Sequence, residues 1–148
     1  MIRVQHETFD AGHEQRRMLE HRTDIGAVVS FTGLVRDFNE RPDVTALTLE
    51  HYPGMTEKML EQIDAEANKR WPLEASLIIH RYGRMEPGEQ IVLVACASPH
   101  REAAFESCHF LIDWLKTKAP FWKLEEKDSG AEWVDARESD EDAAAKWD

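Results

Sequence analysis

The sequence contains few of the residues that build disulfide scaffolds, metal centres or membrane spans. Its only cysteines are Cys96 and Cys108, among 148 residues, and they do not form a C-x-x-C pair. Two such cysteines are too few for a disulfide framework, and their spacing does not match a zinc ligand set. No apolar run approaches the roughly 18 residues of a membrane span, and the N-terminus has no apolar signal core. We therefore expect one cytoplasmic domain, residues 1–148, with no metal site.

Positive charge is also scarce, because 18 Lys and Arg face 29 Asp and Glu, for a formal net charge of -11. Non-specific nucleic-acid binding needs a positive surface, so this composition argues against nucleic acid as a partner. The nucleophile-elbow, P-loop and dinucleotide fingerprints are absent as well. What remains open is a local basic pocket or a basic protein partner.

Hydrophobic periodicity gives the order of the expected elements. We predict strands at 2–9, 25–36, 44–52, 75–82 and 90–98, helices at 11–21, 55–70 and from Ser98-Pro99 to 118, a hairpin of 121–127 with 132–137, and a short helix in the acidic tail, 138–148. In helix 55–70, apolar residues recur at Met55, Met59, Ile63 and Ala67. This order indicates an α+β fold, with a mostly antiparallel sheet, helices packed on one face and a C-terminal hairpin.

One stretch runs against the acidic character of the chain. Between Trp114 and Lys123, three lysines alternate with two Trp, a Phe and a Pro, and no carboxylate intervenes. Lys116 and Lys123, on either side of a rigid bend, could clamp an anion, or one could serve as nucleophile or acid. The alternative is a helix that ends in lysines favoured by its dipole and is followed by a core strand.

Two further positions carry cations where a phosphate would explain them. His100 and Arg101 follow Ser98-Pro99, which we expect to cap and open the long helix. The helix dipole disfavours cations there but favours an anion, so the pair could bind phosphate, or it could be an incidental surface turn. Arg36 ends a buried strand beside Gly33, where we expect a bulge or a close backbone approach. The guanidinium of Arg36 could bind phosphate through two hydrogen bonds, or it could lie in solvent.

The remaining histidines and cysteines are interpreted as structural. Cys96 and Cys108 occupy apolar positions where a free cysteine acts as a small hydrophobe. His51 and His80 lie within predicted strands and are most simply packing residues.

Several of these motifs occur in one order that is specific to a known family. They are Phe31-Thr32-Gly33-Leu34-Val35-Arg36, Leu47-Thr48-Leu49-Glu50-His51-Tyr52-Pro53-Gly54-Met55, Ser98-Pro99-His100-Arg101, Leu115-Lys116-Thr117-Lys118-Ala119-Pro120-Phe121-Trp122-Lys123 and Trp133-Val134-Asp135-Ala136-Arg137-Glu138-Ser139. Over nearly its whole length the chain resembles the large, catalytic subunit of molybdopterin synthase.

The resemblance implies an α/β hammerhead fold and a sulfurtransferase of molybdenum cofactor biosynthesis without a cofactor of its own. The implied substrate is cyclic pyranopterin monophosphate (precursor Z), which becomes the dithiolene of molybdopterin. Sulfur would arrive as a thiocarboxylate on the C-terminal Gly-Gly of a small, ubiquitin-like subunit. The implied assembly is a heterotetramer built on a homodimer of the large subunit.

The same resemblance implies the site residues. Lys116 and Lys123 correspond to the catalytic lysines, and Lys118 is assigned no essential role. The implied substrate-binding residues are Leu34, Val35, Arg36, His100, Arg101, Lys116, Lys123, Leu124 and Glu125. No membrane or metal takes part.

Helix geometry adds one prediction of its own. His100 and Lys116 are sixteen residues apart on one expected helix, or about 24 Å at 1.5 Å per residue. A small pterin cannot contact both ends, so we predict a composite site in which the neighbouring protomer supplies His100 and Arg101. The rival interpretations are a domain that binds a small anion without turnover, and a scaffold whose aromatic groove receives a peptide tail.

Overall fold

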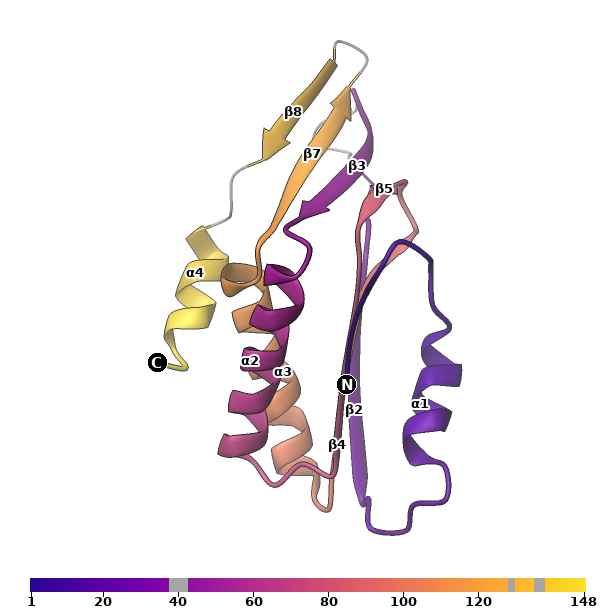
Figure 1. Ribbon diagram of the computed structural model, residues 1–148, viewed down its shortest axis with the longest axis vertical. Coiled ribbons are helices and arrows are strands. Elements are labelled where there is room, and N and C mark those ends of the chain that lie inside the picture. The colour runs from indigo at the N-terminus through magenta and orange to yellow at the C-terminus, as the bar shows by residue number, and fades with distance from the viewer. Residues whose placement is uncertain (38–42, 128–129, 135–137) are drawn as a thin grey trace.

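The computed structural model describes residues 1–37, 43–127, 130–134 and 138–148. Within these ranges the chain forms two four-stranded sheets and four helices (Figure 1). One sheet forms the body of the molecule together with the helices, and the other projects from one end of it. The predicted α+β class is confirmed, although the strands divide between two sheets rather than one.

The body sheet has the strand order β1-β4-β6-β2. Its strands are β1 (Ile2–Gln5), β4 (Ala75–Arg81), β6 (Gln90–Ser98) and β2 (Ala27–Leu34). The β1–β4 pair is parallel and the other two pairs are antiparallel. Strand β6 begins and ends as predicted, because an uninterrupted apolar run suits a strand covered on both faces.

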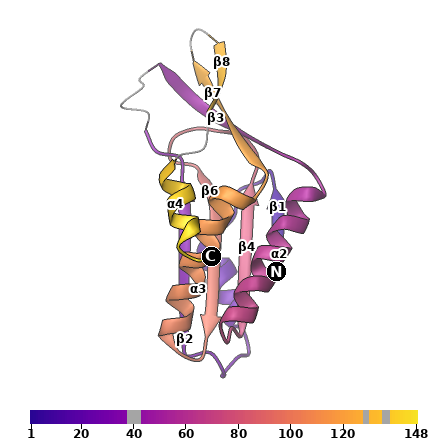
Figure 2. The same cartoon turned by 90° about the vertical axis from the view of Figure 1, so that its left-hand side faces the viewer.

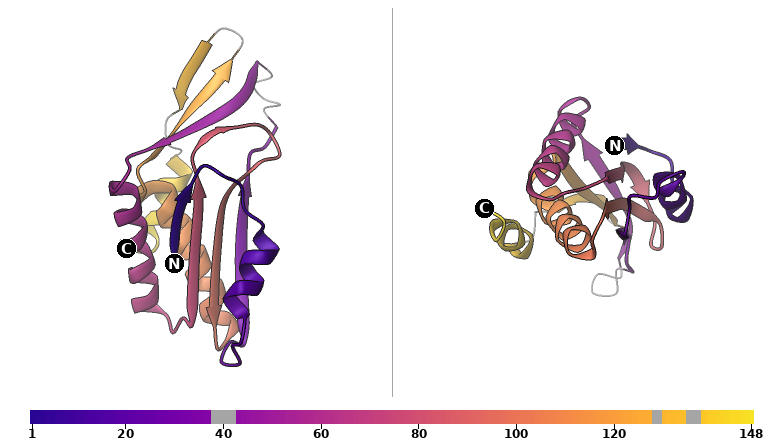
Figure 3. Two further views of the ribbon diagram at one scale, coloured as in Figure 1. Left: turned by 45° about the vertical axis from the view of Figure 1, so that its right-hand side comes forward. Right: turned by 90° about the horizontal axis from the view of Figure 1, so that it is seen from below.

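Helices cover both faces of this sheet, so the expectation of helices on one face is wrong (Figures 1 and 3). Helices α2 (Met55–Arg70) and α3 (Arg101–Lys118) pack on one face, around Ile78 and Val94. The short helix α1 (Ala11–Leu19) covers the other face, around residues such as Ile79. Neighbouring strand residues point to opposite faces, so the apolar runs of β4 and β6 supply both cores.

Helix α2 has the predicted bounds, and its predicted stripe is confirmed at Ile63 and Ala67 but differs in the first turn. The buried residues are Thr56, Leu60, Ile63 and Ala67. Met55, predicted to face inward, is 54% exposed. Thr56 is accommodated in the interior because its hydroxyl donates to the Tyr52 carbonyl at 2.8 Å.

The projecting sheet has the order β5-β3-β7-β8, and all its neighbours are antiparallel (Figure 2). Its strands are β5 (Gly83–Met85), β3 (Val44–His51), β7 (Phe121–Lys127) and β8 (Gly130–Val134). Leu47 and Leu49 of β3 pack inward with Val35 and Met85 in a small core of their own. The predicted hairpin is confirmed for β7 and β8, while its turn and residues 135–137 fall outside the described ranges.

The acidic tail forms helix α4 (Glu138–Ala145), as predicted, and packs beside α3. The indole of Trp147 donates to the buried carboxylate of Asp113 at 2.6 Å. The indole of Trp114 donates to the Ala144 carbonyl at 3.3 Å. Across the described ranges, no helix is long and apolar enough to span a membrane.

Candidate active site at the joint between the sheets

The two candidate catalytic lysines lie on either side of the bend that leads from one half of the molecule to the other. Lys116 is exposed in the last turn of α3, which ends at Lys118. The Phe121 amide donates to the Ala119 carbonyl at 2.8 Å, and this tight turn starts β7. Lys123 is the third residue of that strand and is also exposed. The chain therefore places two ammonium groups near the turn between α3 and β7, that of Lys116 from the helix and that of Lys123 from the strand.

The end of strand β4 brings a buried histidine to this joint. The His80 ring is stacked on Phe121, with ring centroids 3.7 Å apart and planes 16° apart. Its Nδ1 donates to the Arg81 carbonyl at 2.8 Å. On the neighbouring sheet, His51 contacts Phe121 as well, at 5.9 Å between centroids. Phe121 is therefore packed between a ring of each sheet.

The charge environment of His80 connects it to both lysines. Burial is the main cause that lowers the pKa of His80, to about 4, while the hydrogen bond to Arg81 opposes this shift. The positive charges of Lys116, His51 and Lys123 lower the pKa further. At neutral pH the imidazole is therefore uncharged, and it lies within electrostatic reach of both ammonium groups.

The lowered pKa predicts a specific loss of stability in acid. Unfolded His80 binds a proton near pH 6.5 and folded His80 only near pH 4. Stability from the neutral ring is therefore complete above pH 6.5 and is lost as the pH falls to 4. A shift of this size corresponds to about 3 kcal/mol of unfolding free energy. In urea unfolding, the unfolding free energy of the wild type should fall by about 3 kcal/mol more between pH 7 and pH 4 than that of His80→Phe.

The matched control for this measurement is Leu93→Ala, because Leu93 is buried in the same sheet and has no titratable group. It should lower stability by the same amount at both pH values, since every titratable group of the wild type is kept. Equal pH dependence of wild type and His80→Phe would contradict the assignment of the acid loss to His80.

Strand alternation separates the residues that follow Lys123. Lys123 and Glu125 point to one face of β7, and Glu125 is only 3% exposed. Leu124 points to the opposite face, where its register partner is Trp133 of β8. Of the two predicted neighbours, only Glu125 therefore shares the face of Lys123. Lys118 packs its ammonium over the Trp114 ring at 4.4 Å, which accounts for it without a role in the site.

The end of strand β2 holds the predicted arginine segment. The register shifts between Gly33 and Leu34, so the predicted bulge is confirmed. Leu34 and Arg36 are exposed, whereas Val35 is 3% exposed. The Val35 amide donates to the Glu89 carbonyl at 2.9 Å, and its own carbonyl accepts from Gly88 at 2.7 Å. Val35 therefore fixes the strand end, and Leu34 and Arg36 offer their side chains to solvent.

The opposite end of α3 carries His100 and Arg101. The prediction that Ser98 caps the helix is wrong, since His100 occupies the N-cap position. Ser98 is buried and donates to the Pro72 carbonyl at 3.1 Å, which anchors the turn before the helix. Exposed His100 and Arg101 line an open hollow of about 420 Å³ together with Gly26, Ala27, Pro99 and Glu102.

The structure therefore brings only part of the predicted site together within one chain. Helix α3 is continuous from Arg101 to Lys118. At 1.5 Å per residue, His100 and Lys116 are separated by about 24 Å along the helix. His100 and Arg101 cannot share a small substrate with the lysines of their own chain.

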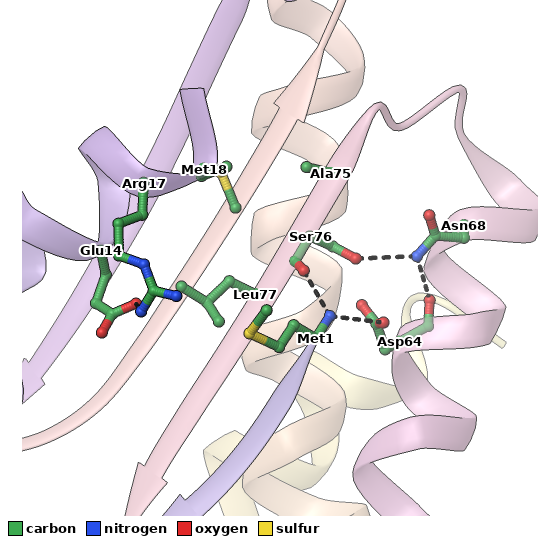
Figure 4. A pocket seen from close by; sticks show the side chains of 9 residues that line it. All are labelled: Met1, Glu14, Arg17, Met18, Asp64, Asn68, Ala75, Ser76 and Leu77. Carbon is green, nitrogen blue, oxygen red and sulfur yellow. Dashed lines mark hydrogen bonds and ion pairs between the residues drawn. The ribbon is translucent and has the colours of Figure 1, made fainter. Parts of the chain in front are cut away.

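A second cavity lies beside the start of β4 and is lined by residues of α1 and α2 (Figure 4). Its volume is about 560 Å³, and it is lined by Met1, Glu14, Arg17, Met18, Asp64, Asn68, Ala75, Ser76 and Leu77. It adjoins the start of β4, whereas His80 near the strand's other end is about 17 Å further on at 3.3 Å per residue. None of the predicted site residues lines this cavity.

Cys96 and Cys108 are both buried in the core between the body sheet and its helices. In the part of the chain that the structure describes, no three His, Cys, Asp or Glu side chains gather as metal ligands. The interpretation of His80 as a packing residue is confirmed, since it is 5% exposed and its ring is stacked on Phe121. Its place beside both lysines was not predicted, because those partners belong to other elements.

The fold and its basic joint define an α+β domain suited to group transfer with an anionic reactant. Comparisons give the family. The model of the MoaE protein family matches residues 4–118. The molybdopterin synthase catalytic subunit of Pseudomonas aeruginosa is 56% identical over 146 residues, which cover 99% of this chain and 97% of that protein.

Solved structures agree with this assignment. The MoaE protein of Burkholderia ambifaria superposes with a TM-score of 0.85 at 50% identity, covering 99% of this chain and 97% of that one. A complex of subunits 1 and 2 of molybdopterin-converting factor from Helicobacter pylori shares the fold, with a TM-score of 0.77 at 19% identity and coverage of 92% and 91%. The chain belongs to the MoaE family of molybdopterin synthase catalytic subunits, which confirms the resemblance and the predicted enzyme of molybdenum cofactor biosynthesis.

Proposed function

We propose that this chain transfers sulfur from the thiocarboxylated C-terminus of a small ubiquitin-like subunit to cyclic pyranopterin monophosphate. The observation that supports this most directly is the convergence of Lys116 and Lys123 on one joint beside His80. Two ammonium groups suit a reaction between an anionic sulfur donor and a phosphate-bearing substrate. Family membership adds the reaction type, and the cytoplasmic location stays a prediction.

The chain supplies no sulfur of its own in this proposal. Both of its cysteines are buried in the core and therefore cannot serve as exposed nucleophiles. The attacking sulfur belongs to the partner's thiocarboxylate and displaces an oxygen from a carbon of the substrate, so that one carbon–sulfur bond forms as one carbon–oxygen bond breaks and the leaving oxygen takes up a proton. Water then cleaves the bond between that sulfur and the acyl carbon, which leaves the partner with an ordinary carboxylate. Lys116 holds the anionic reactants and passes a proton as sulfur attacks, with Lys123 beside it.

The phosphate would be bound by cations that two protomers share. Arg36 lies beyond the bulged end of β2, and Leu34 lies beside it. His100 and Arg101 come from the neighbouring chain in a homodimer, because α3 keeps them far from their own lysines. One homodimer of this chain and two small subunits would form the predicted heterotetramer.

The edge of the body sheet is a suitable surface for that dimer. Strand β2 is one of the two edge strands of the body sheet, and Phe31 on it is 39% exposed. Phe105 on α3 is 62% exposed and Leu34 is 54% exposed. Strand β2 runs from the hollow of His100 to the bulge before Arg36, since Gly26 bonds to Ser98 at 3.0 Å. A two-fold antiparallel contact along it would bring His100 of one protomer toward Arg36 of the other.

The test is conversion of cyclic pyranopterin monophosphate to molybdopterin by the purified chain with a thiocarboxylated small subunit. We expect product with the thiocarboxylate and none when the same subunit ends in a carboxylate. Tight binding of both components without product would overturn the proposal in favour of a domain that binds an anion or a peptide tail without turnover.

A further inference from the structure

Phe121 connects the positions of the two lysines. It is the first residue of β7, and Lys123 lies two residues further along the same face of that strand. On its other side, only Ala119 and Pro120 separate Phe121 from the end of α3. A shift of the Phe121 backbone would therefore move the Lys123 side chain relative to Lys116.

His80 is the ring of the body sheet that contacts Phe121 most closely, beside the apolar core of α2 and α3 against which Phe121 also packs. The two rings are nearly parallel, with centroids 3.7 Å apart. His51, the register partner of Phe121, contacts it less closely, at 5.9 Å and a 37° tilt. His51 belongs to the projecting sheet with Phe121, and its Nδ1 lies 3.0 Å from the Thr56 hydroxyl of α2, so it also joins that sheet to the body, but it holds Phe121 less closely. His80, in β4 of the body sheet, makes the closer ring contact with Phe121 itself.

His80 is itself held firmly. Its ring is 5% exposed, and its Nδ1 donates to the Arg81 carbonyl. Arg81 is also 5% exposed, and its guanidinium donates to the carbonyls of His6 at 3.0 Å and Gln90 at 2.8 Å. Backbone on both sides of β4 therefore anchors the strand end that carries the ring.

We propose that His80 is a positioning residue for the reaction: its ring, stacked on Phe121, fixes the start of β7 against the end of α3 and so sets the spacing of Lys116 and Lys123. The inference rests on the sulfur transfer proposed above, and it assigns His80 no contact with substrate. The charged or titratable groups that act on the ring are Lys116, Lys123 and His51. An uncharged ring suits this place, because an imidazolium would repel both ammonium groups.

The test compares His80→Ala, which removes the stacked ring, with His80→Phe, which keeps a flat ring without nitrogens. Leu93→Ala is the matched control for lost stability, since Leu93 is 1% exposed in the core on the opposite face of the same sheet. Assays run at a temperature where all variants are folded by circular dichroism. We expect the kcat of His80→Ala to fall at least about tenfold with KM changed by less than about threefold, because displaced catalytic groups cost rate.

His80→Phe should recover kcat to within about threefold of wild type, and Leu93→Ala should keep the wild-type rate despite its lower stability. If His80→Ala is as fast as Leu93→Ala, the ring positions nothing and the proposal is wrong. If folded His80→Phe is as slow as His80→Ala, the stack is not what matters and the proposal is also wrong.

A second readout does not depend on turnover. Competitive acetylation with acetic anhydride, followed by mass spectrometry, compares Lys116 and Lys123 with Lys69, an exposed lysine of α2. In His80→Ala the relative rates at Lys116 and Lys123 should change at least about twofold while Lys69 stays constant, because lysine reactivity follows its surroundings. Unchanged rates would overturn the positioning role even if the enzyme is active. If the wild type is inactive but His80→Ala still changes the labelling, the proposed sulfur transfer is wrong and the positioning role of His80 stands.

Discussion

Replacement of Lys116 by Ala is expected to abolish turnover, by about a thousandfold or more, in a protein that still folds and binds its small subunit. Lys116 is exposed in the last turn of α3, and its charge acts on His80 together with that of Lys123. Loss of an exposed side chain should change the unfolding free energy by less than about 0.5 kcal/mol, because Ala is also a good helix former. Product formation and gel filtration of the mixed subunits measure the two outcomes.

The matched control is Lys118→Ala, two residues further along the same helix end. Lys118 is also exposed, but its ammonium lies over the Trp114 ring. We expect its activity to stay within about threefold of wild type. An equal loss in both variants would point to the helix end rather than to Lys116. Lost subunit assembly in Lys116→Ala would identify a structural lysine.

Lys116→Arg separates the roles that remain open for this side chain. Arginine keeps the positive charge but holds its proton at any working pH. Recovery of turnover would assign Lys116 to holding the anionic reactants. An Arg variant as inactive as the Ala variant would favour proton transfer or a covalent role.

Local patterns predicted most of the elements because each is closed by strong signals. Helix α2 has the predicted bounds, Met55–Arg70, between Pro53-Gly54 and Trp71-Pro72. Strand β6 also has the predicted bounds, since its apolar run starts after the turn at Pro87-Gly88. Helix α3 ends at Lys118 as expected, two residues before Pro120.

Errors arose where distant segments decide the structure. Periodicity does not show that α1 crosses to the second face of the body sheet. It also gives no sign that the three-residue β5 completes the projecting sheet beside β3. Ser98 has the side chain of a helix cap, but its hydroxyl donates to the Pro72 carbonyl of a distant segment, and the helix begins only at Arg101. Each of these outcomes depends on a partner that a local window does not contain.

The same distinction applies to the site. Lys116 and Lys123 could be singled out from sequence as candidates, because an unbroken basic and aromatic stretch is unusual in an acidic chain, while their catalytic role is implied by the family resemblance and stays a prediction. His80 could not, because its partners are Phe121 and the two lysines, which belong to other elements. A histidine within a strand resembles any packing residue until the fold shows what it faces.

Two inactive variants of this chain are expected to restore activity when they are mixed. Lys116→Ala removes the lysine from one end of α3, and Arg101→Ala removes the arginine from the other end. The two residues are about 22 Å apart along the helix at 1.5 Å per residue, too far for one small substrate. In the composite site that we propose, each active centre takes Lys116 from one protomer and Arg101 from its partner.

The expected recovery follows from two-fold symmetry. Random exchange of equal amounts makes half of the dimers mixed, and a mixed dimer contains one intact and one doubly defective centre. About a quarter of all centres should therefore be active. The measurement is product formation after exchange, with mixed dimers verified by two distinct affinity tags. A double Lys116→Ala, Arg101→Ala protein mixed with Lys116→Ala is the control, and it should recover nothing because no centre regains Lys116. If verified mixed dimers of the two single variants stay inactive, His100 and Arg101 do not complete the neighbouring centre, and the hollow at the start of α3 serves another purpose.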